Sequence, residues 1–361
     1  MSYEDGWAAI NLEKPARIPR TEYSAESYHW PLVAAVTGRE VTADSPRDER
    51  EAASVDFMRA WSYDFRWSTL VSSSFLGAYT TDMGHAAYAQ AGSDYHARGE
   101  PAFADPDAVL AFDPLYGLPH YDHADLVRRF NDHYRANCDR YPDAVNMTGT
   151  YVTVVSGLID MLGWDTLLLT AGLDARGFGR FTDRYAKWMR RFYEALAECE
   201  APLVMVHDDI VWTSGPFIAP EWYRAHVFPN YRMLFEPLKQ AGKKIAYTSD
   251  GDYTLFVDDL AEAGVDGFVM EPMTDMQLIA ERHGRTHFFI GNADTRILLS
   301  GSREEIEDEV ERCIAIGRDC PGYFLAVGNH IPANTPVENA LWYNECYERR
   351  MMRHGVAGGN R

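Results

Sequence analysis

Short apolar runs alternate along the chain with longer amphipathic segments, and from residue 204 onward each apolar run ends in a polar turn. Short apolar runs bounded by turn residues favour buried strands, whereas apolar positions at helical spacing favour helices. Strand after strand ends in polar or acidic residues. Because the C-terminal ends of the strands in a barrel lie at one face, this pattern predicts one shared site. The runs are 204–206, 244–247, 268–270, 288–290 and 324–327, and the turns are His207-Asp208-Asp209, Thr248-Ser249-Asp250-Gly251, Glu271-Pro272, Gly291-Asn292-Ala293-Asp294 and Gly328-Asn329-His330.

The remaining pattern extends the alternation to eight strands. Further strands are expected at 17–23, 64–70 and 146–152, and helices at 175–200, 220–239 and 303–316. Ser302 followed by Glu305 predicts a capping box at the start of the last of these helices. Alternating strands and helices predict a parallel sheet, and eight of them predict an α/β fold of the (β/α)8 TIM-barrel type.

Two segments interrupt this rhythm. The stretch 80–143 is dense in Gly, Pro, Asp and Tyr, which predicts an insertion or lid before the third strand. The end of the chain, 352–361, predicts a flexible tail.

Length and charge narrow the classes of protein to which the chain can belong. With 361 residues, 46% of them hydrophobic, it is long enough for one barrel domain over 1–361. A formal net charge of −20 and the absence of a Lys/Arg-rich run disfavour nucleic acid and anionic membranes as partners. Residues 1–20 lack a signal-peptide pattern, and no apolar run approaches the ~18 residues that span a bilayer. We therefore expect a cytoplasmic protein.

The strand-end residues predict a site rich in carboxylates and imidazoles. The candidate catalytic residues are Asp209, Asp250, Glu271 and His330. Two kinds of chemistry are open. Asp250, Glu271 and His330 could bind a divalent metal such as zinc, which would polarise a substrate oxygen. Alternatively, crowding of carboxylates raises the pKa of one of them, which then donates a proton to a leaving oxygen.

Other residues at the strand ends are candidates for substrate binding. An acidic residue after a strand can instead cap the next helix, and this structural alternative applies to Asp208, Asp294 and Asp252. A histidine held in a structural hydrogen bond is the alternative for His207 and His330. The candidate substrate-binding residues, with Trp212 as a further aromatic wall, are Glu22, Tyr23, Trp67, Tyr151, His207, Asn292, Asp294 and Asn329.

The order of motifs from Asp143 to Tyr347 resembles the uroporphyrinogen decarboxylase superfamily. The segments that carry the resemblance are TGTYVTVVSGLIDMLGWD, an acidic DD after an apolar strand, a lysine-led strand ending in SDG, GNADTRILLSG and GNHIPANTPVENALWY. The superfamily also contains cobalamin-linked methyltransferases, and the resemblance implies a (β/α)8 barrel with its pocket at the carboxyl ends of the strands.

The chain departs from both known branches of this superfamily. Where the decarboxylases carry a basic MRQAGRY-like segment and an FSDIL-like motif, it has the residues from Arg20 to Ser24 and from Arg66 to Leu70. An acidic mouth would also repel an octacarboxylate. Where the thiol-acceptor methyltransferases bind zinc through His-x-Cys and a later Cys, it has Thr248, Asp250 and Asn329.

A divergent methyltransferase is the function that the resemblance favours. We expect a corrinoid-linked methyltransferase or O-demethylase that acts on a small polar methoxylated substrate. Its corrinoid would sit on a separate carrier protein, because the chain lacks a DxHxxG-type signature. The alternatives are a decarboxylase or lyase of a smaller substrate, and a non-catalytic barrel that binds a small molecule. Members of the family are often dimers, so a homodimer is expected.

Overall fold

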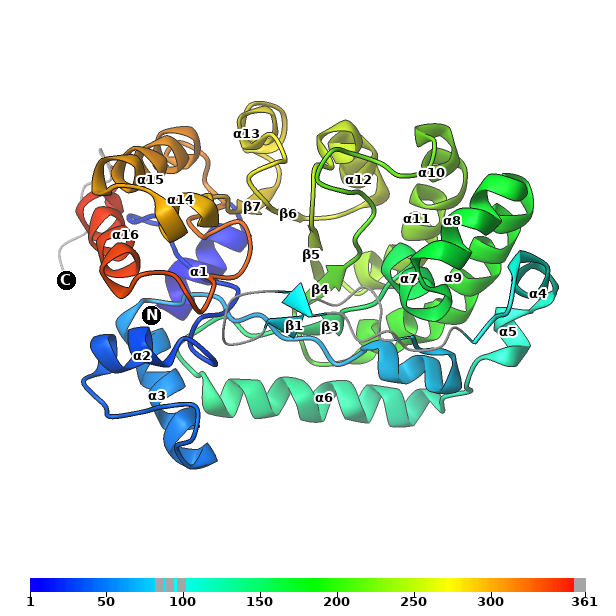
Figure 1. Cartoon of the computed structure of the whole chain (residues 1–361), viewed down its shortest axis with the longest axis horizontal. Helices are drawn as coiled ribbons and strands as arrows, with labels where there is room; N and C mark the ends of the chain where they lie inside the picture. The colour runs from blue at the N-terminus through cyan, green and yellow to red at the C-terminus, as the bar shows by residue number, and fades with distance from the viewer. Residues whose placement is uncertain (82–86, 89–93, 96–101, 354–361) are drawn as a thin grey trace.

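The computed structural model describes residues 1–81, 87–88, 94–95 and 102–353, and its centre is a six-stranded parallel sheet in the order β3-β4-β5-β6-β7-β8 (Figure 1). Each strand pairs with the next one along the chain; Val204, for example, lies opposite Thr148 on one side and Ile245 on the other. The strands are β3 (Thr148–Thr150), β4 (Leu203–His207), β5 (Lys244–Ser249), β6 (Gly267–Met270), β7 (Phe288–Ile290) and β8 (Tyr323–Phe324), and a separate antiparallel pair is β1 (Ala87–Tyr88) and β2 (Asp94–Tyr95).

Helices surround this sheet, and they follow the strands as the sequence pattern predicts (Figure 1). The α-helices are α1 (Tyr3–Ile10), α2 (Trp30–Thr37), α3 (Arg47–Ala60), α4 (Pro106–Ala111), α5 (Pro114–Gly117), α6 (His123–Arg140), α7 (Val155–Leu162), α8 (Trp164–Leu173), α9 (Ala175–Glu198), α10 (Pro220–His226), α11 (Phe228–Gln240), α12 (Val257–Ala263), α13 (Met276–His283), α14 (Thr295–Ser300), α15 (Arg303–Gly317) and α16 (Val337–Arg350), and the 3-10 helices are η1 (Ser73–Tyr79) and η2 (Thr254–Phe256).

The two expected N-terminal strands close the sheet into a barrel, although each is reduced to isolated bridges. Arg20 makes parallel bridges to both Tyr63 and Leu325, and Phe65 makes one to Val145. The ladder stays short because Pro19 has no N–H and because the N–H of Arg20 donates to the Asp64 carboxylate at 3.0 Å. The fold is therefore the predicted (β/α)8 barrel.

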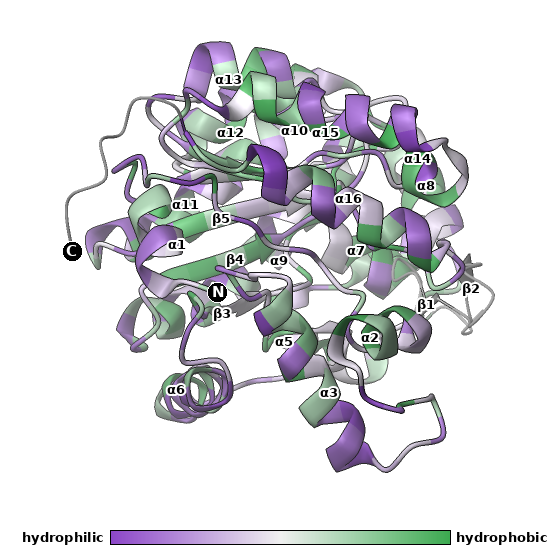
Figure 2. Cartoon of the chain, turned by 90° about the vertical axis from the view of Figure 1, so that its left-hand side faces the viewer, coloured by the Kyte–Doolittle hydropathy of each residue, from purple (hydrophilic) through white to green (hydrophobic). Residues whose placement is uncertain are grey.

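Alternation along the strands separates the core into two layers. In β4, Leu203 and Met205 point into the barrel, whereas Val204 and Val206 pack against the helices. Ile10 of α1 joins the cluster inside the barrel. Figure 2 shows the hydrophobic strand β4 in the middle of the molecule, with helices of mixed hydrophobic and hydrophilic residues around it. In the described part of the chain, no helix has the length and apolar character that crossing a membrane requires.

The structure revises several predicted boundaries. The helix expected at 220–239 is two helices, α10 and α11, because Pro229 at the start of α11 cannot continue the hydrogen-bond pattern of α10. The segment 80–143 contains α6, which packs against α9 and β3 as a helix of the barrel itself. The capping box at Ser302 and Glu305 is confirmed. In the expected tail, Arg353 still donates its N–H to Ala16, and 354–361 lie outside the described residues.

Arg20 and Glu22 form a buried ion pair at the closure of the barrel. Both side chains are 0% exposed, and Arg20 Nη2 lies 2.9 Å from Glu22 Oε1. The guanidinium lies 4.4 Å from the ring centre of Trp61 and 5.0 Å from that of Tyr343. The second oxygen of Glu22 accepts the N–H of Val327 at 2.9 Å, so this carboxylate ties the first strand to the segment that follows β8.

Replacing Glu22 by Gln should lower the free energy of unfolding by about 3 kcal/mol or more, because the Arg20 charge stays buried without its counter-ion. The measurement is urea unfolding followed by circular dichroism. The control is Glu345→Gln, which removes an exposed ion pair to Arg349 and should cost no more than about 1 kcal/mol. Equal destabilisation by the two variants would contradict this role of the pair.

Candidate active site

A cavity of about 520 Å³ lies at the carboxyl ends of the strands. This volume suits a small-molecule ligand. Its walls come from the turns after β4, β5, β6 and β8 and from the starts of α8 and α14. The lining residues are Trp164, Asp209, Val211, Trp212, Thr213, Asp250, Gly251, Glu271, Thr295, Asn329, His330 and Pro332.

The structure brings all the candidate catalytic residues to this cavity. Asp209, Asp250, Glu271 and His330 line it together with Asn329, one of the candidate substrate-binding residues. They are far apart in sequence, and they meet because parallel strands all end at the same edge of the barrel. Which of them acts on a substrate stays a prediction.

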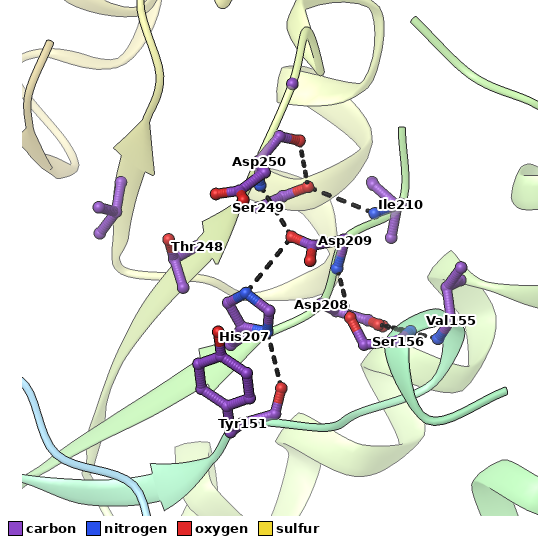
Figure 3. Close-up of polar contacts among 12 residues, drawn as sticks. Tyr151, Val155, Ser156, His207, Asp208, Asp209, Ile210, Thr248, Ser249 and Asp250 are labelled. Atoms are coloured by element: carbon purple, nitrogen blue, oxygen red, sulfur yellow. Dashed lines mark hydrogen bonds and ion pairs between the residues drawn. The ribbon is translucent and has the colours of Figure 1, made fainter. Parts of the chain in front are cut away.

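His207 and Asp209 form a pair at the end of β4 (Figure 3). The Nδ1 atom of His207 lies 2.7 Å from the backbone oxygen of Tyr151, and Nε2 lies 3.3 Å from Asp209 Oδ1. The rings of His207 and Tyr151 stack, with centroids 4.1 Å apart. Since both ring nitrogens face oxygen acceptors, the doubly protonated imidazolium satisfies both contacts, whereas either neutral tautomer satisfies one.

Main-chain groups fix the carboxylates around Asp250. The N–H of Asp250 donates to Asp209 Oδ1 at 2.8 Å, and the N–H of Gly251 donates to Glu271 Oε2 at 2.7 Å. The amide of Asn329 donates to the other oxygen of Glu271 at 2.6 Å. Gly251 has a φ of +81°, and a Cβ there would lie 2.5 Å from the backbone oxygen of Trp212, so this turn requires glycine.

The environment of Asp250 favours its protonated form. The cavity leaves Asp250 open to solvent, yet the protein packed around its carboxyl raises its pKa well above the ordinary value. The negative charges of Asp209 and Glu271 raise this pKa further, while His207 and Asn329 offset only part of the increase. Burial and the charges of Asp209 and Glu271 therefore both favour the protonated form of Asp250.

An aromatic group lies on the side of the first two strands. The hydroxyl of Tyr23 donates to Thr248 Oγ1 at 3.0 Å, and its ring stacks on Trp67 at 4.5 Å. The edge of His330 lies against Tyr23 at 5.4 Å, and the Nδ1 atom of His330 contacts the hydroxyl of Ser24. Tyr23 and Trp67 belong to the cluster inside the barrel, beside the cavity and not among the residues that line it.

Asp208 has a structural role. Its side chain is buried and accepts the N–H groups of Val154, Val155 and Ser156 at 2.9, 3.1 and 2.6 Å. The hydroxyl of Tyr231 donates to it at 2.5 Å. Asp208 therefore caps the N-terminus of α7, a helix that precedes its own strand, and not the next helix along the chain, which was the structural alternative predicted for it.

Three candidate substrate-binding residues have structural contacts outside the cavity. Glu22 is buried in its pair with Arg20. Asp294 caps α14, where it accepts the N–H of Arg296 at 2.9 Å and pairs with the Arg296 guanidinium. Asn292 is 1% exposed, and its amide donates to the backbone oxygen of Glu271 at 3.2 Å. The strand-end pattern cannot separate such residues from the site, because it does not specify which side of the turn each side chain takes.

Trp164 and Thr295 line the cavity and escape the strand-end pattern. Both stand at the first position of a helix, α8 and α14 respectively, so neither directly follows an apolar run. Trp164 contacts Trp212 and Phe217, with ring centroids 5.8 and 5.1 Å away. The tertiary fold therefore supplies an aromatic wall of which only Trp212 was a candidate from the sequence.

The described residues offer no preformed metal site. Among them, no three His, Cys, Asp or Glu side chains converge in an arrangement that could hold a metal ion. Each carboxylate oxygen of Glu271 accepts a hydrogen bond, one from Gly251 and one from Asn329, and the Nδ1 atom of His330 contacts Ser24. The metal site expected at Asp250, Glu271 and His330 stays a prediction.

Replacing Asp250 by Asn should stabilise the protein at about pH 8 and do so less and less as the pH falls toward about 5. A carboxyl whose pKa is raised by folding binds more protons in the folded state, so its destabilising effect grows as pH rises from the unfolded pKa to the folded one. The melting temperatures of the two proteins, compared across this range, measure the effect. A difference that does not change with pH would contradict the raised pKa of Asp250.

Comparisons with known proteins agree with this architecture. The model of the family described as Uroporphyrinogen decarboxylase (URO-D) matches residues 131–349. The uroporphyrinogen decarboxylase of Pelobacter propionicus is 27% identical over 137 residues, which are 38% of this chain and 40% of that protein. That of Syntrophotalea carbinolica is 27% identical over 172 residues, 48% of each chain. The matched part thus spans less than half the length of these two relatives.

A solved structure extends the likeness of fold to nearly the whole chain. A methyltransferase from Methanosarcina mazei superposes with a TM-score of 0.65, covering 97% of this chain and 99% of that one at 15% sequence identity. At this identity the likeness concerns the fold alone. Because the family model matches more than half of the 361 residues, the chain belongs to the uroporphyrinogen decarboxylase family.

Proposed function

We propose that this chain is a methyltransferase that takes a methyl group from an oxygen of a small polar methoxylated substrate and passes it to a corrinoid on a separate carrier protein. The observation that carries the proposal is the carboxyl of Asp250, which faces a 520 Å³ cavity between Asp209 and Glu271 and has a raised pKa. The likeness of fold to a methyltransferase agrees with it.

In this proposal Asp250 acts as the general acid. Breaking the bond between the methyl carbon and oxygen leaves the electron pair on oxygen, and an alkoxide is a poor leaving group. The protonated carboxyl of Asp250 gives its proton to that oxygen as the bond breaks, so the substrate departs as a neutral alcohol. The reduced corrinoid supplies the electron pair of the new bond to the methyl group, and solvent reprotonates Asp250 afterwards.

The neighbours of Asp250 hold the backbone of the turn that carries its carboxyl. Asp209 accepts the backbone N–H of Asp250, and Glu271 accepts that of Gly251. His207 in turn holds Asp209 at 3.3 Å. Because the donors are main-chain groups on rigid strand ends, the acid keeps its place before a substrate arrives.

The second candidate is a decarboxylase of a smaller substrate, which the names of the relatives favour. The charge of the cavity disfavours it. Asp209, Asp250 and Glu271 line the cavity, and none of the described lining residues is lysine or arginine. A substrate carboxylate would meet like charges there without a cationic partner. The homodimer and the cytoplasmic location remain predictions from the sequence.

The test is formation of methylcobalamin from free reduced cobalamin and small methyl ethers, followed by absorbance, with release of CO₂ from matched carboxylic acids measured in parallel. The wild type should form methylcobalamin. Asp250→Asn should slow an alkyl methyl ether by about 100-fold or more, the usual contribution of a general acid. An aryl methyl ether should suffer much less, since a phenol has a pKa of about 10 and leaves without a proton.

The matched control is Asp139→Asn, an exposed carboxylate on α6, which should keep the wild-type rate. Melting temperatures show that both variants are folded. Equal losses for the alkyl and aryl ethers in Asp250→Asn would contradict its role as an acid. Release of CO₂ without methyl transfer would replace the proposal by the decarboxylase.

A further inference from the structure

We infer that the substrate carries an ammonium group in addition to its methoxy group, an inference that rests on the proposed function. Such a molecule is a small organic cation, and two features of the cavity select it: the sign of the lining charges and a pair of tryptophans. The relatives are named for uroporphyrinogen, and neither of these features of the cavity is suited to a polyanion.

Three carboxyl groups line the cavity, and those that are ionised give it a negative charge. Asp209, Asp250 and Glu271 come from three different strand ends, and no lysine or arginine is among the described lining residues. The Arg296 guanidinium is near this edge of the barrel, but Asp294 holds it at 2.6 Å, and it does not line the cavity. A cation entering the cavity therefore meets net attraction, and an anion meets net repulsion.

These carboxyl groups together keep a net negative charge when their own hydrogen-bond partners are taken into account. Glu271 accepts hydrogen bonds from two neutral donors, the N–H of Gly251 and the amide of Asn329, and the Arg296 guanidinium, which pairs with Asp294, acts on its charge through space. Asp209 shares one oxygen with His207 and with the N–H of Asp250. Even with His207 charged and Asp250 protonated, the cluster keeps the negative charge of Glu271.

The tryptophans supply a second, independent feature. Trp164 and Trp212 both line the cavity, with ring centroids 5.8 Å apart at an angle of 49°. Phe217 lies against both rings, at 5.1 and 5.5 Å. An ammonium group binds to the face of a tryptophan ring, which carries the negative part of its quadrupole.

The Trp212 side chain is exposed to solvent, and backbone hydrogen bonds fix the turn that carries it. The side chain is 46% exposed, an unusual position for so large an apolar group. The N–H and the oxygen of Trp212 pair with those of Gly215 at 2.8 and 3.0 Å, and its oxygen also accepts the N–H of Asp252 at 3.1 Å. The turn therefore presents the ring beside Asp250 and Glu271 before any ligand binds.

The inference divides the work among the carboxyl groups. Glu271 and Asp209, with the tryptophans, would hold the ammonium group, whose donors suit carboxylate acceptors. Asp250 would keep its proton for the methoxy oxygen. An enzyme built in this way binds the charged end of its substrate and reacts at the neutral end.

The test compares three ligands of nearly equal size, all methoxylated: 2-methoxyethylammonium, 2-methoxyethanol and methoxyacetate. Their affinities for the wild type are measured by calorimetry at about pH 7, and tetramethylammonium is added as a competitor. The cation should bind at least about tenfold more tightly than the alcohol, with methoxyacetate weakest, because of the lining charges. Added salt should weaken the binding of the cation and leave the affinity of the alcohol unchanged. Equal or tighter binding of the alcohol or of methoxyacetate, or no binding of any ligand, would overturn the inference.

Variants assign the effect to the named residues. Glu271→Gln removes the charge, keeps the size of the side chain and retains one of its two hydrogen-bond acceptors, and Trp212→Leu removes the aromatic face. Each should weaken the cation by about fivefold or more while the alcohol changes little. Tyr116→Leu is the control, because Tyr116 is also an exposed aromatic residue, at 86%, and lies outside the cavity. Loss of affinity for the alcohol and the cation alike would mean that the cavity has been deformed, which contradicts charge selection.

Methylcobalamin formation separates this inference from the proposed function. If 2-methoxyethylammonium binds selectively but gives no methylcobalamin, the inference stands and the methyltransferase proposal fails. If methyl transfer occurs and is fastest, relative to KM, with the neutral alcohol, the methyltransferase proposal stands and the inference fails.

Discussion

The closure of the barrel by the first strand is the constraint on which the site depends. Arg20 bridges the backbones of Tyr63 and Leu325, which lie at the two edges of an otherwise open arrangement of strands. Its guanidinium is buried against Glu22 and aromatic rings, and Glu22 reaches across to the N–H of Val327. An ion pair taken fully out of water is weak evidence for stability, but the Glu22 carboxylate also accepts the N–H of Val327 and thereby sets the register of the first strand against the segment after β8.

That register places the turn after β8 beside the carboxylates at the ends of the earlier strands. Asn329 and His330 follow the segment held by Glu22, and Asn329 donates to Glu271 across the mouth. Asp208 is a second buried carboxylate that holds a turn, in this case the turn after β4. It caps α7, and the adjacent Asp209 lines the cavity. The buried carboxylates of Glu22 and Asp208 thus support the turns, and Asp209, the sequence neighbour of Asp208, lines the cavity.

The cavity departs from what the names of the relatives suggest. The chain has the fold of its family, yet three carboxyl groups and two tryptophans line the mouth, with no lysine or arginine among the described lining residues. A shared barrel does not imply a shared substrate, because the turns after the strands vary while the strands remain. Charge and aromatic surface at those turns are therefore the better guide to function.

The sequence by itself determined the strands, the barrel and the set of polar turns. Apolar runs such as 288–290 coincide with β7, because a run buried on both faces leaves a continuous signal. The first two strands carry a weaker signal. The helical spacing of apolar residues over 220–239 predicted one helix and concealed the break that Pro229 causes. Asp209, Asp250 and Glu271 were placed at the mouth from sequence alone, since every parallel strand ends at the same edge.

Only the tertiary structure decided which of these polar residues face the cavity. Asp208 and Asp209 are adjacent and chemically identical, yet one caps a helix and the other lines the cavity. Glu22 looked like a residue of the mouth and is paired with Arg20, and Trp164 showed no signal at all. The physical reason is that a side chain's direction at a strand end is set by partners from distant segments, such as the N–H groups of α7, and these partners meet only when the barrel closes.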